Sequence, residues 1–307
     1  MFRTAAPASA PAAGIVNAMS VDVEDWFQVS AFERVIARDS WDAQPCRVER
    51  NVEAILALFD AHRVQATFFT LGWVAERYPQ MVRRIVAAGH ELASHGYGHQ
   101  RVTQLSREQF RDDLLRSKQV LEDLGGAPVV GYRAPSFSIG AANLWAHDVL
   151  RETGHVYSSS VYPVRHDLYG MPDAPRFAHV LDNGLLEIPP STVQAAGRNF
   201  PASGGGFFRL LPYGVSRRLI GRINAHESHA AMFYFHPWEI DPGQPRVTNA
   251  GAKSRFRHYV NLARNQAKLA RLLSDFAWDR VDRVFAADIA AARDAFAHRS
   301  SPAAAAS

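Results

Sequence analysis

The sequence of 307 residues predicts an α/β fold, specifically a distorted (β/α) barrel of about seven strands. Two observations lead to this prediction. Short runs of β-branched and aromatic residues alternate with amphipathic helical segments, which is the pattern of parallel βα units. In addition, the residues with catalytic chemistry each follow a predicted strand, and this is where a (β/α) barrel gathers its active site.

The elements of the first half come in a regular order. The apolar and β-branched runs predict strands over 15–23, 66–71, 90–94 and 129–132. The helical periodicity predicts helices over 47–62, 78–88 and 107–124. Gly89 ends the second of these helices and Gly125-Gly126 ends the third, as glycine does at helix ends.

The second half is less regular. Strands are predicted over 184–189 and 230–235, and a long terminal helix over 258–276, while 163–182 and 200–212 resemble inserted loops. We find no internal repeat and no linker composition, so we expect one domain over 15–290. Residues 1–14 and 291–307 are predicted to be a disordered leader and tail, because both ends are rich in small residues and proline.

Composition excludes several classes of protein. Apolar residues make up 47% and charged residues 21%, which is ordinary for a globular protein. The net charge of +4 comes from scattered Lys and Arg, so no nucleic-acid-binding stripe is predicted. Cys46 is the single cysteine, which excludes an intrachain disulfide and a thiolate metal site. Neither a transmembrane segment nor a signal peptide is recognised, so we expect a cytoplasmic protein, associated with membranes only through partners.

Two histidines and an acidic cluster suggest a metal site. His95 and His99 are four residues apart in SHGYGH, and Asp22, Glu24 and Asp25 end the first predicted strand. Neutral imidazole is the commonest ligand for a divalent transition metal. Two imidazoles and one carboxylate would make a three-ligand site with an open position for water. The chain has 13 histidines, so the pair becomes informative through the motifs around it.

The order of the motifs resembles the polysaccharide deacetylases of carbohydrate esterase family 4, the NodB-homology enzymes. The matching motifs are the acidic cluster, ATFFTLG, SHGYGH, the Arg133-to-Pro135 motif in YRAPSFS, and His236 in FYFHPWE. The resemblance covers about residues 15–290. The segments VDVEDWFQVSAFE, LEIPPST and FRHYVNLARNQAKLARLLSDF resemble the subfamily of bacterial exopolysaccharide loci and the exosortase/PEP-CTERM system.

The resemblance implies metal-assisted hydrolysis of an amide. His95 and His99 would bind Zn²⁺, with Co²⁺ or Ni²⁺ as alternatives, together with one carboxylate of the acidic cluster. Asp22 would be the general base and His236 the general acid that protonates the leaving amine. Arg133 would orient the Asp22 carboxylate through a charge-assisted hydrogen bond.

The carboxylate ligand is ambiguous between Glu24 and Asp25. Strand alternation puts Asp22 and Glu24 on one face, which favours Glu24 if the strand stays regular. A bulge after Val23 would favour Asp25. By analogy with ligands adjacent to the strand end, we lean to Asp25 and keep both as candidates.

One departure from the family concerns Ser158, which stands where related sequences carry an Asp. If that Asp tunes the late histidine, Asp167 or Glu187 are candidates to replace it. Substrate binding is predicted for three residues beside the site motifs, Trp26, Pro135 and Trp238. Aromatic rings there would stack on sugar faces, although core packing explains them equally well.

The predicted function is removal of acetyl groups from N-acetylated sugars of a bacterial exopolysaccharide or its lipid-linked precursor, with the exopolysaccharide biosynthesis machinery as partner. One alternative is an allantoinase-like hydrolase of cyclic amides or ureides, against which the retained histidine pair argues. The other is a non-catalytic carbohydrate-binding component of an export complex. The full set of catalytic residue types argues against it, because binding alone needs no general acid.

Overall fold

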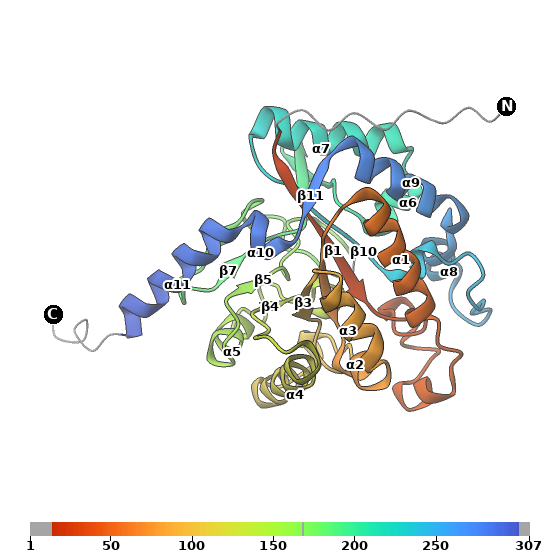
Figure 1. Cartoon of the computed structure of the whole chain (residues 1–307), viewed down its shortest axis with the longest axis horizontal. Helices are drawn as coiled ribbons and strands as arrows, with labels where there is room; N and C mark the ends of the chain where they lie inside the picture. Colours follow the sequence, from red (N-terminus) through yellow and green to blue (C-terminus); the bar gives the residue numbers. More distant parts are fainter. Residues whose placement is uncertain (1–13, 168, 301–307) are drawn as a thin grey trace.

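The computed structural model describes residues 14–167 and 169–300 (Figure 1). Within these residues, nine strands form the main sheet and two more form a separate hairpin. The strands of the main sheet are β1 (Val16–Val23), β2 (Thr67–Thr70), β3 (Glu91–Ser94), β4 (Gly131–Tyr132), β5 (Tyr157–Ser158), β6 (His179–Val180), β7 (Leu186–Glu187), β10 (Met232–Phe235) and β11 (Ala277–Asp279). The hairpin consists of β8 (Thr192–Ala195) and β9 (Arg198–Pro201).

The main sheet is a succession of parallel strands. Seven of them lie in the order β10-β1-β2-β3-β4-β5-β7 and are parallel to their neighbours. β11 adds to the start of β1 in parallel, and β6 adds to β7 as an antiparallel edge. In the described part of the chain the two ends of this order do not pair, so the sheet is a curled, open barrel. The α/β class predicted from the sequence is confirmed.

β1 is central to the arrangement because it pairs with three strands. Ser20 lies opposite Thr67 of β2 on one side and Tyr234 of β10 on the other. Apart from Val16, every residue of β1 is buried. A parallel strand covered on both faces requires such a mostly apolar sequence, and this explains why β1 reads as one apolar run that ends in carboxylates.

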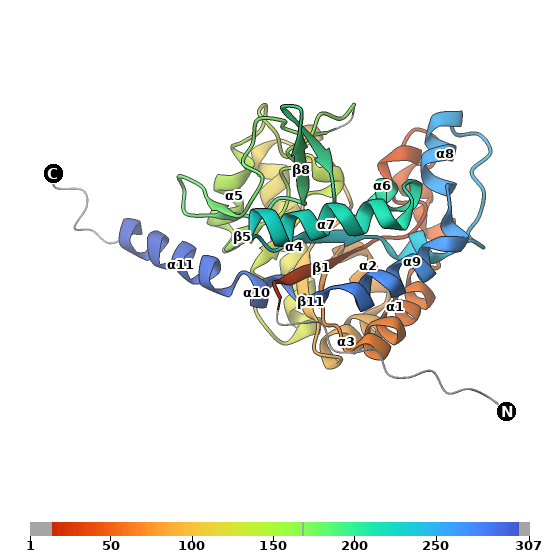
Figure 2. The same cartoon turned by 90° about the horizontal axis from the view of Figure 1, so that it is seen from above.

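Helices cover the outside of the sheet and connect its strands. They are α1 (Val48–His62), α2 (Gly72–Arg77), α3 (Pro79–Ala87), α4 (Arg107–Gly125), α5 (Ala146–Glu152), α6 (Gly205–Leu210), α7 (Tyr213–Glu227), α8 (Ala252–Tyr259), α9 (Leu262–Asp275), α10 (Val281–Val284) and α11 (Ala286–Ser300). α3 and α4 pack against β3, and α9 packs against α1 (Figures 1 and 2). No helix of the described chain combines the length and the apolar character needed to cross a lipid bilayer.

Three sequence predictions need correction. The predicted terminal helix is broken into α8 and α9, because Asn261 adopts a left-handed conformation with φ of 54°. The segment 200–212 contains α6, a helix of six residues that is too short to show a period. Residues 291–300 continue α11 instead of forming a disordered tail, since their alanine-rich sequence favours a helix. The rest of that tail and residues 1–13 of the predicted leader lie outside the described residues.

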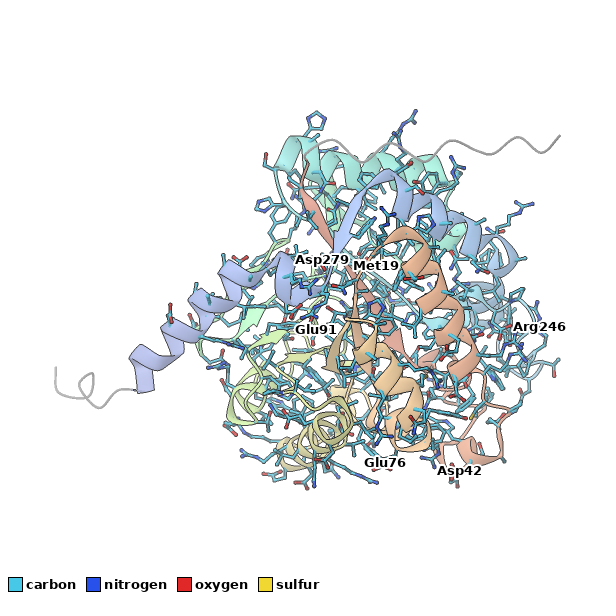
Figure 3. The ribbon with its side chains drawn as sticks, viewed as in Figure 1. Met19, Asp42, Glu76, Glu91, Arg246 and Asp279 are labelled. Carbon is cyan, nitrogen blue, oxygen red and sulfur yellow. The ribbon has the colours of Figure 1, made fainter. Side chains whose placement is uncertain are left out.

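The fold buries one carboxylate on the side of the sheet away from the strand ends that carry the acidic cluster. Glu91, which is labelled in Figure 3, begins β3 and accepts hydrogen bonds from the hydroxyl groups of Thr67 and Tyr157. Burial raises the pKa of Glu91 to about 7, with the Asp282 carboxylate adding to the effect. This group therefore holds strand β3 to its neighbours and takes no part in the site described next.

Candidate active site

One pocket of about 430 Å³ opens at the carboxyl ends of β1, β3 and β10. Five of the residues predicted to carry the chemistry line it, namely Asp22, Glu24, His95, His99 and His236. Residues separated by more than two hundred positions meet here because β1 and β10 are neighbours in the sheet. The pocket is therefore the site that the sequence pattern predicts at the strand ends.

A tight turn after β1 directs Glu24 into the pocket. The Glu24 N–H donates to the carbonyl oxygen of Asp22 at 3.0 Å, so the chain leaves the strand at this residue. The indole N–H of Trp238 donates to Glu24 Oε1 at 3.1 Å, and the Oε2 atom lies 2.6 Å from His99 Nε2. Burial raises the pKa of Glu24, but His99, His236 and His95 outweigh it and hold the pKa well below its usual value.

Asp25 points away from the pocket, which corrects our preference for it as the metal ligand. Its Oδ2 accepts hydrogen bonds from the backbone amides of Arg47 at 2.6 Å and Val48 at 2.9 Å, at the start of α1. Its Oδ1 accepts the amide of Trp26 at 2.8 Å. Burial raises the pKa of Asp25 to about 6 despite these bonds. Asp25 therefore anchors the first turn of α1 to the end of β1.

His95 and His99 present ring nitrogens to the same point as Glu24. The Nδ1 atom of His95 lies 2.8 Å from the carbonyl oxygen of Arg133. A carbonyl only accepts, so Nδ1 carries the hydrogen and the Nε2 lone pair is free to bind a metal. Burial lowers the pKa of His95 to about 4, which keeps this ring neutral. His99 adopts a φ of 53°, and its carbonyl oxygen accepts a hydrogen bond from Arg38 at 2.8 Å.

These three side chains fit a divalent metal. One donor atom each from Glu24, His95 and His99 lies within 4.8 Å of the others, and all three residues are buried. Within the described residues, no donor is aligned to hydrogen-bond Glu24 Oε2, although His99 Nε2 is close. A buried carboxylate oxygen without an aligned hydrogen-bond donor, beside the ring nitrogens of two histidines, offers donor atoms of the types that bind a divalent transition metal.

Asp22 is held by a fully buried arginine. Arg133 Nη1 donates to Asp22 Oδ1 at 2.6 Å and to Ser20 Oγ at 2.8 Å, and no part of Arg133 is exposed. Its guanidinium also lies over the Phe69 ring, with 4.1 Å between the guanidinium carbon and the ring centroid. These contacts fix Arg133, and its hydrogen bond to Oδ1 fixes the Asp22 carboxylate with Oδ2 toward the pocket.

The serine run at the end of β5 supports Arg133 and does not reach the late histidine. Ser159 Oγ accepts from Arg133 Nη2 at 3.0 Å, and Ser160 Oγ accepts from the amide of Ala134 at 2.9 Å. Ser158 donates to Ser160 at 2.9 Å. The serine at position 158 thus belongs to the network that holds the loop of Arg133.

The acidic partner of His236 is Glu239, which the sequence analysis missed. Glu239 Oε1 lies 2.6 Å from His236 Nδ1, and its Oε2 accepts from Arg209 Nε at 2.7 Å. The predicted substitutes lie elsewhere, since Asp167 pairs with Lys253 and Glu187 accepts backbone amides. The signal for Glu239 was its place three residues after the histidine in FYFHPWE.

The charges around His236 favour its protonated form. Burial lowers the pKa of His236, but the carboxylates of Glu24, Glu239 and Asp22 outweigh it and raise the pKa to about 9. Its Nε2 atom lies 3.6 Å from Glu24 Oε1 and 3.8 Å from Asp22 Oδ2. His236 therefore directs a proton into the pocket from Nε2 while Nδ1 faces Glu239.

The three residues predicted to bind substrate have different positions. Trp238 lines the pocket, stacked on His236 with ring centroids 5.2 Å apart. Trp26 is 3% exposed and donates its indole N–H to the Pro45 carbonyl, so it belongs to the core. Pro135 is buried and lies outside the pocket lining, which Ser136 joins in its place. Trp26 and Pro135 are corrections to the predicted set.

Comparison with known families divides the chain into two adjoining matches. Residues 39–157 match the family model described as "Polysaccharide deacetylase". Residues 159–286 match a domain of unknown function, DUF3473. The deacetylase match contains His95, His99 and Arg133, whereas His236 lies in the second match and Asp22 precedes both.

Curated proteins similar to part of this chain include two that are named as deacetylases. The chain is 32% identical over 113 residues to a peptidoglycan deacetylase of Helicobacter pylori, covering 37% of this chain and 38% of that protein. It is 31% identical over 109 residues to a chitooligosaccharide deacetylase of Sinorhizobium fredii, covering 35% of this chain and 48% of that protein. The chain thus spans less than half of the length of these relatives.

Solved structures share the fold over nearly the whole chain. A crystal structure assigned by name to the polysaccharide deacetylases, from Mycobacterium smegmatis, has a TM-score of 0.58 at 22% identity and covers 98% of this chain and 97% of that one. The structure of PuuE allantoinase has a TM-score of 0.57 at 18% identity and covers 95% and 93%. These likenesses support the fold alone and do not separate the two activities.

Proposed function

We propose that this protein is a metal-dependent N-deacetylase that removes acetyl groups from N-acetylated sugars of a bacterial exopolysaccharide or its lipid-linked precursor. The observation that carries the proposal is the convergence of Glu24, His95 and His99 in a pocket that Asp22 and His236 also line. The curated relatives, named as deacetylases of peptidoglycan and of chitooligosaccharides, support the reaction class. The exopolysaccharide assignment rests on the sequence motifs.

The metal ligands in this proposal are Glu24, His95 and His99, and the metal is zinc, with cobalt or nickel as alternatives. When bound, the metal would polarise the acetyl carbonyl oxygen and lower the pKa of a water molecule. The hydrogen bonds from Trp238 to Glu24 and from His95 to the Arg133 carbonyl hold two of the ligands in position. Such outer partners orient ligands and fix the imidazole tautomer.

Asp22 is the proton acceptor in this proposal. Arg133 occupies Asp22 Oδ1, so Oδ2 is the oxygen that is left to take the proton of the attacking water. The carboxylate is 2% exposed, and its position is set by a guanidinium that has no exposure at all. A general base placed in this way removes the need to reorient the side chain during the reaction.

His236 is the proton donor. Its Nε2 proton passes to the amide nitrogen as the C–N bond breaks, so the sugar leaves as a neutral amine and not as an amide anion. Acetate is the second product. Glu239 and Arg209 do not touch the reacting atoms in this scheme, and they act by holding His236 in its protonated form.

We further propose that residues 15–290 act as one catalytic domain. The proton acceptor comes from β1, the histidine pair from the end of β3, and the proton donor from the end of β10. Neither family match contains all of these groups, so the segment of unknown function would supply the proton-donating half of the same site.

The experiment combines metal analysis with acetate release from N-acetylglucosamine oligomers. The purified protein should contain about one equivalent of zinc and release acetate, and chelation should abolish release until zinc, cobalt or nickel is restored. The variants His95→Ala and His99→Ala should lose metal and activity, because two protein ligands hold a labile ion poorly. His226→Ala is the matched control, since His226 is exposed at the end of α7 and outside the pocket.

The same experiment separates the alternative functions. Formation of the ring-opened acid from allantoin, without acetate release, would favour the cyclic-amide hydrolase. Saccharide binding without any hydrolysis by the metal-loaded protein would favour a binding component. Full zinc content in a His95→Ala/His99→Ala double variant would contradict the metal site itself.

A further inference from the structure

Three exposed apolar side chains surround the mouth of the pocket. Phe207 and Leu210 belong to α6 and Phe256 belongs to α8, and they are 38%, 47% and 59% exposed. Eight large apolar side chains are exposed in the described part of the chain, and only these three line the pocket. Exposed apolar side chains that lie together and are rimmed by polar residues are typical of an interaction surface.

The fold directs these side chains outward. On α6 the neighbours Phe208 and Arg209 are buried, so Phe207 and Leu210 are left on the solvent side. On α8 the buried residue is His258, which stacks on Trp238 with ring centroids 4.1 Å apart. Both cartoon views place α6 and α8 together at the end of the molecule opposite the C-terminus (Figures 1 and 2).

The same rim is positively charged. α8 carries three exposed cations, Lys253, Arg255 and Arg257, and its sequence AKSRFRHY contains no acid. Asp167 pairs with Lys253 at 2.6 Å and with Arg257 at 3.2 Å, so one of the three charges is offset and an excess of two remains. Arg246, which is also exposed, projects at this end of the molecule (Figure 3).

We propose that this surface, the α6–α8 rim, docks on a lipid bilayer with anionic headgroups. The rim consists of Phe207, Leu210, Lys253, Arg255, Phe256 and Arg257. Phe and Leu insert at the boundary between headgroups and acyl chains, while Lys and Arg attract anionic lipid. Exposed apolar side chains next to an excess of two cations match the two parts of an anionic lipid, the acyl chain and the headgroup.

Docking of the rim would turn the pocket mouth toward the membrane surface. An acetylated sugar attached to a lipid would then meet the pocket without leaving the bilayer. The inference goes beyond the proposed deacetylase activity, and it can be tested without turnover, because binding to vesicles requires no hydrolysis. Failure of one proposal therefore does not imply failure of the other.

The experiment measures co-sedimentation of the full-length, metal-loaded protein with vesicles. We expect binding to vesicles that contain phosphatidylglycerol and weak binding to pure phosphatidylcholine. Raising the salt from about 0.1 M to about 1 M should weaken binding, because the Debye length falls from ~10 Å to ~3 Å. Lys253→Gln/Arg255→Gln should reduce the partition coefficient roughly 30-fold, at the contribution typical of each basic residue near an anionic surface.

The apolar part is tested by Phe207→Ser/Leu210→Ser/Phe256→Ser, which should reduce partitioning by about tenfold or more. The matched control is Leu115→Ser/Leu144→Ser/Phe200→Ser, three side chains that are 45–48% exposed and outside the pocket. Thermal unfolding verifies that each variant is folded. Absence of vesicle binding by the parent protein, or an equal loss in the control, would overturn the proposal. So would self-association through the rim without vesicle binding, which would make the rim an interface between copies of this chain.

Discussion

Replacement of Glu239 by glutamine should shift the pH dependence of catalysis. Glu239 Oε1 lies 2.6 Å from His236 Nδ1 and 3.2 Å from the His236 amide nitrogen. Glutamine keeps the size of the side chain and one acceptor oxygen, but it removes the negative charge. The variant Glu239→Gln therefore changes the electrostatics of His236 with little change in shape.

The magnitude follows from the pKa of His236. Burial lowers this pKa, and the carboxylates of Glu24, Glu239 and Asp22 together raise it to about 9. Because the pKa is raised, the protonated donor dominates below about pH 9 and is lost above it. Because Glu24 and Asp22 remain, the variant removes only the part of this rise that Glu239 supplies, and a fall of the pKa by about one unit would lower the protonated fraction at about pH 8.5 from roughly three quarters to roughly one quarter. At about pH 6 the same change costs less than twofold.

The assay is kcat/KM for acetate release from N-acetylglucosamine oligomers, measured from about pH 5.5 to about pH 9.5. The alkaline limb of the profile should move to lower pH in Glu239→Gln. An alkaline limb at the parent position would refute the role of Glu239 in holding the proton on His236.

A stability control is needed because the variant leaves Arg209 buried without its carboxylate. Breaking a buried pair costs up to about 3–5 kcal/mol, so the unfolding temperature is measured first. Asp241→Asn is the matched control. Asp241 is a buried carboxylate paired with Arg47 at 2.5 Å, and it lies two residues after Glu239 without contacting His236. It should lose stability and keep the alkaline limb of the parent.

Three further predictions concern groups around the site and the sheet. Glu24→Gln should lose bound metal in an elemental analysis. Asp25→Asn should retain metal and lose about 1–2 kcal/mol of stability, because Asp25 caps the start of α1. Metal loss in Asp25→Asn alone would reverse the assignment of the ligand. Arg133→Met should lower the free energy of unfolding by about 3–5 kcal/mol in denaturant titrations, because it leaves Asp22 buried without its cation, and a change below about 1 kcal/mol would contradict this. Glu91 has a raised pKa of about 7, so its contribution to stability is complete below about pH 4.5 and is lost as the pH rises through 7. Glu91→Gln should therefore gain thermal stability relative to the parent between about pH 5 and about pH 8, and a difference that does not change with pH would argue against the shift.

Much of the fold could be predicted because its signals are local. In the first half, each βα unit is indicated by a short apolar run followed by a segment with helical periodicity. The strands of a parallel sheet then end on the same side. This logic was sufficient to bring Asp22, His95 and His236 to one pocket. The predicted strands over 66–71 and 90–94 correspond to β2 and β3 within one residue at each end.

The choice between Glu24 and Asp25 could not be made from the sequence because it depends on one turn. The alternation of β1 favours Glu24, and the hydrogen bond from the Glu24 amide to the Asp22 carbonyl keeps it directed into the pocket. Asp25 is drawn the other way by amides of α1, more than twenty residues later. A pattern with period two carries no information on such a distant partner.

The sequence analysis did not identify the acidic partner of His236 for a related reason. Glu239 was visible in the motif, but its role requires the short helical turn Pro237–Ile240 that folds it back onto His236. Arg209 gave no signal at all, because α6 reaches the pocket only through a close approach of Gly204 to β10. A Cβ atom at Gly204 would lie 1.5 Å from the carbonyl oxygen of Tyr234. Tertiary packing of this kind leaves no periodic trace in the sequence.

The position of β1 between β2 and β10 has a consequence for how the chain acquires its site. The paired residues of β1 and β2 are separated by about fifty positions in the sequence. The other edge of β1 pairs with β10, which lies more than two hundred residues after β1. Contacts of such high sequence separation form late, because the entropy of closing the long loop must be lost before the contacts can stabilise the structure. During synthesis the growing polypeptide would therefore hold an incomplete pocket, which contains the two proposed histidine ligands but lacks the proton donor His236 and the Trp238 side chain that orients Glu24. Hydrolysis would begin only after β10, the strand that precedes His236, has paired with β1.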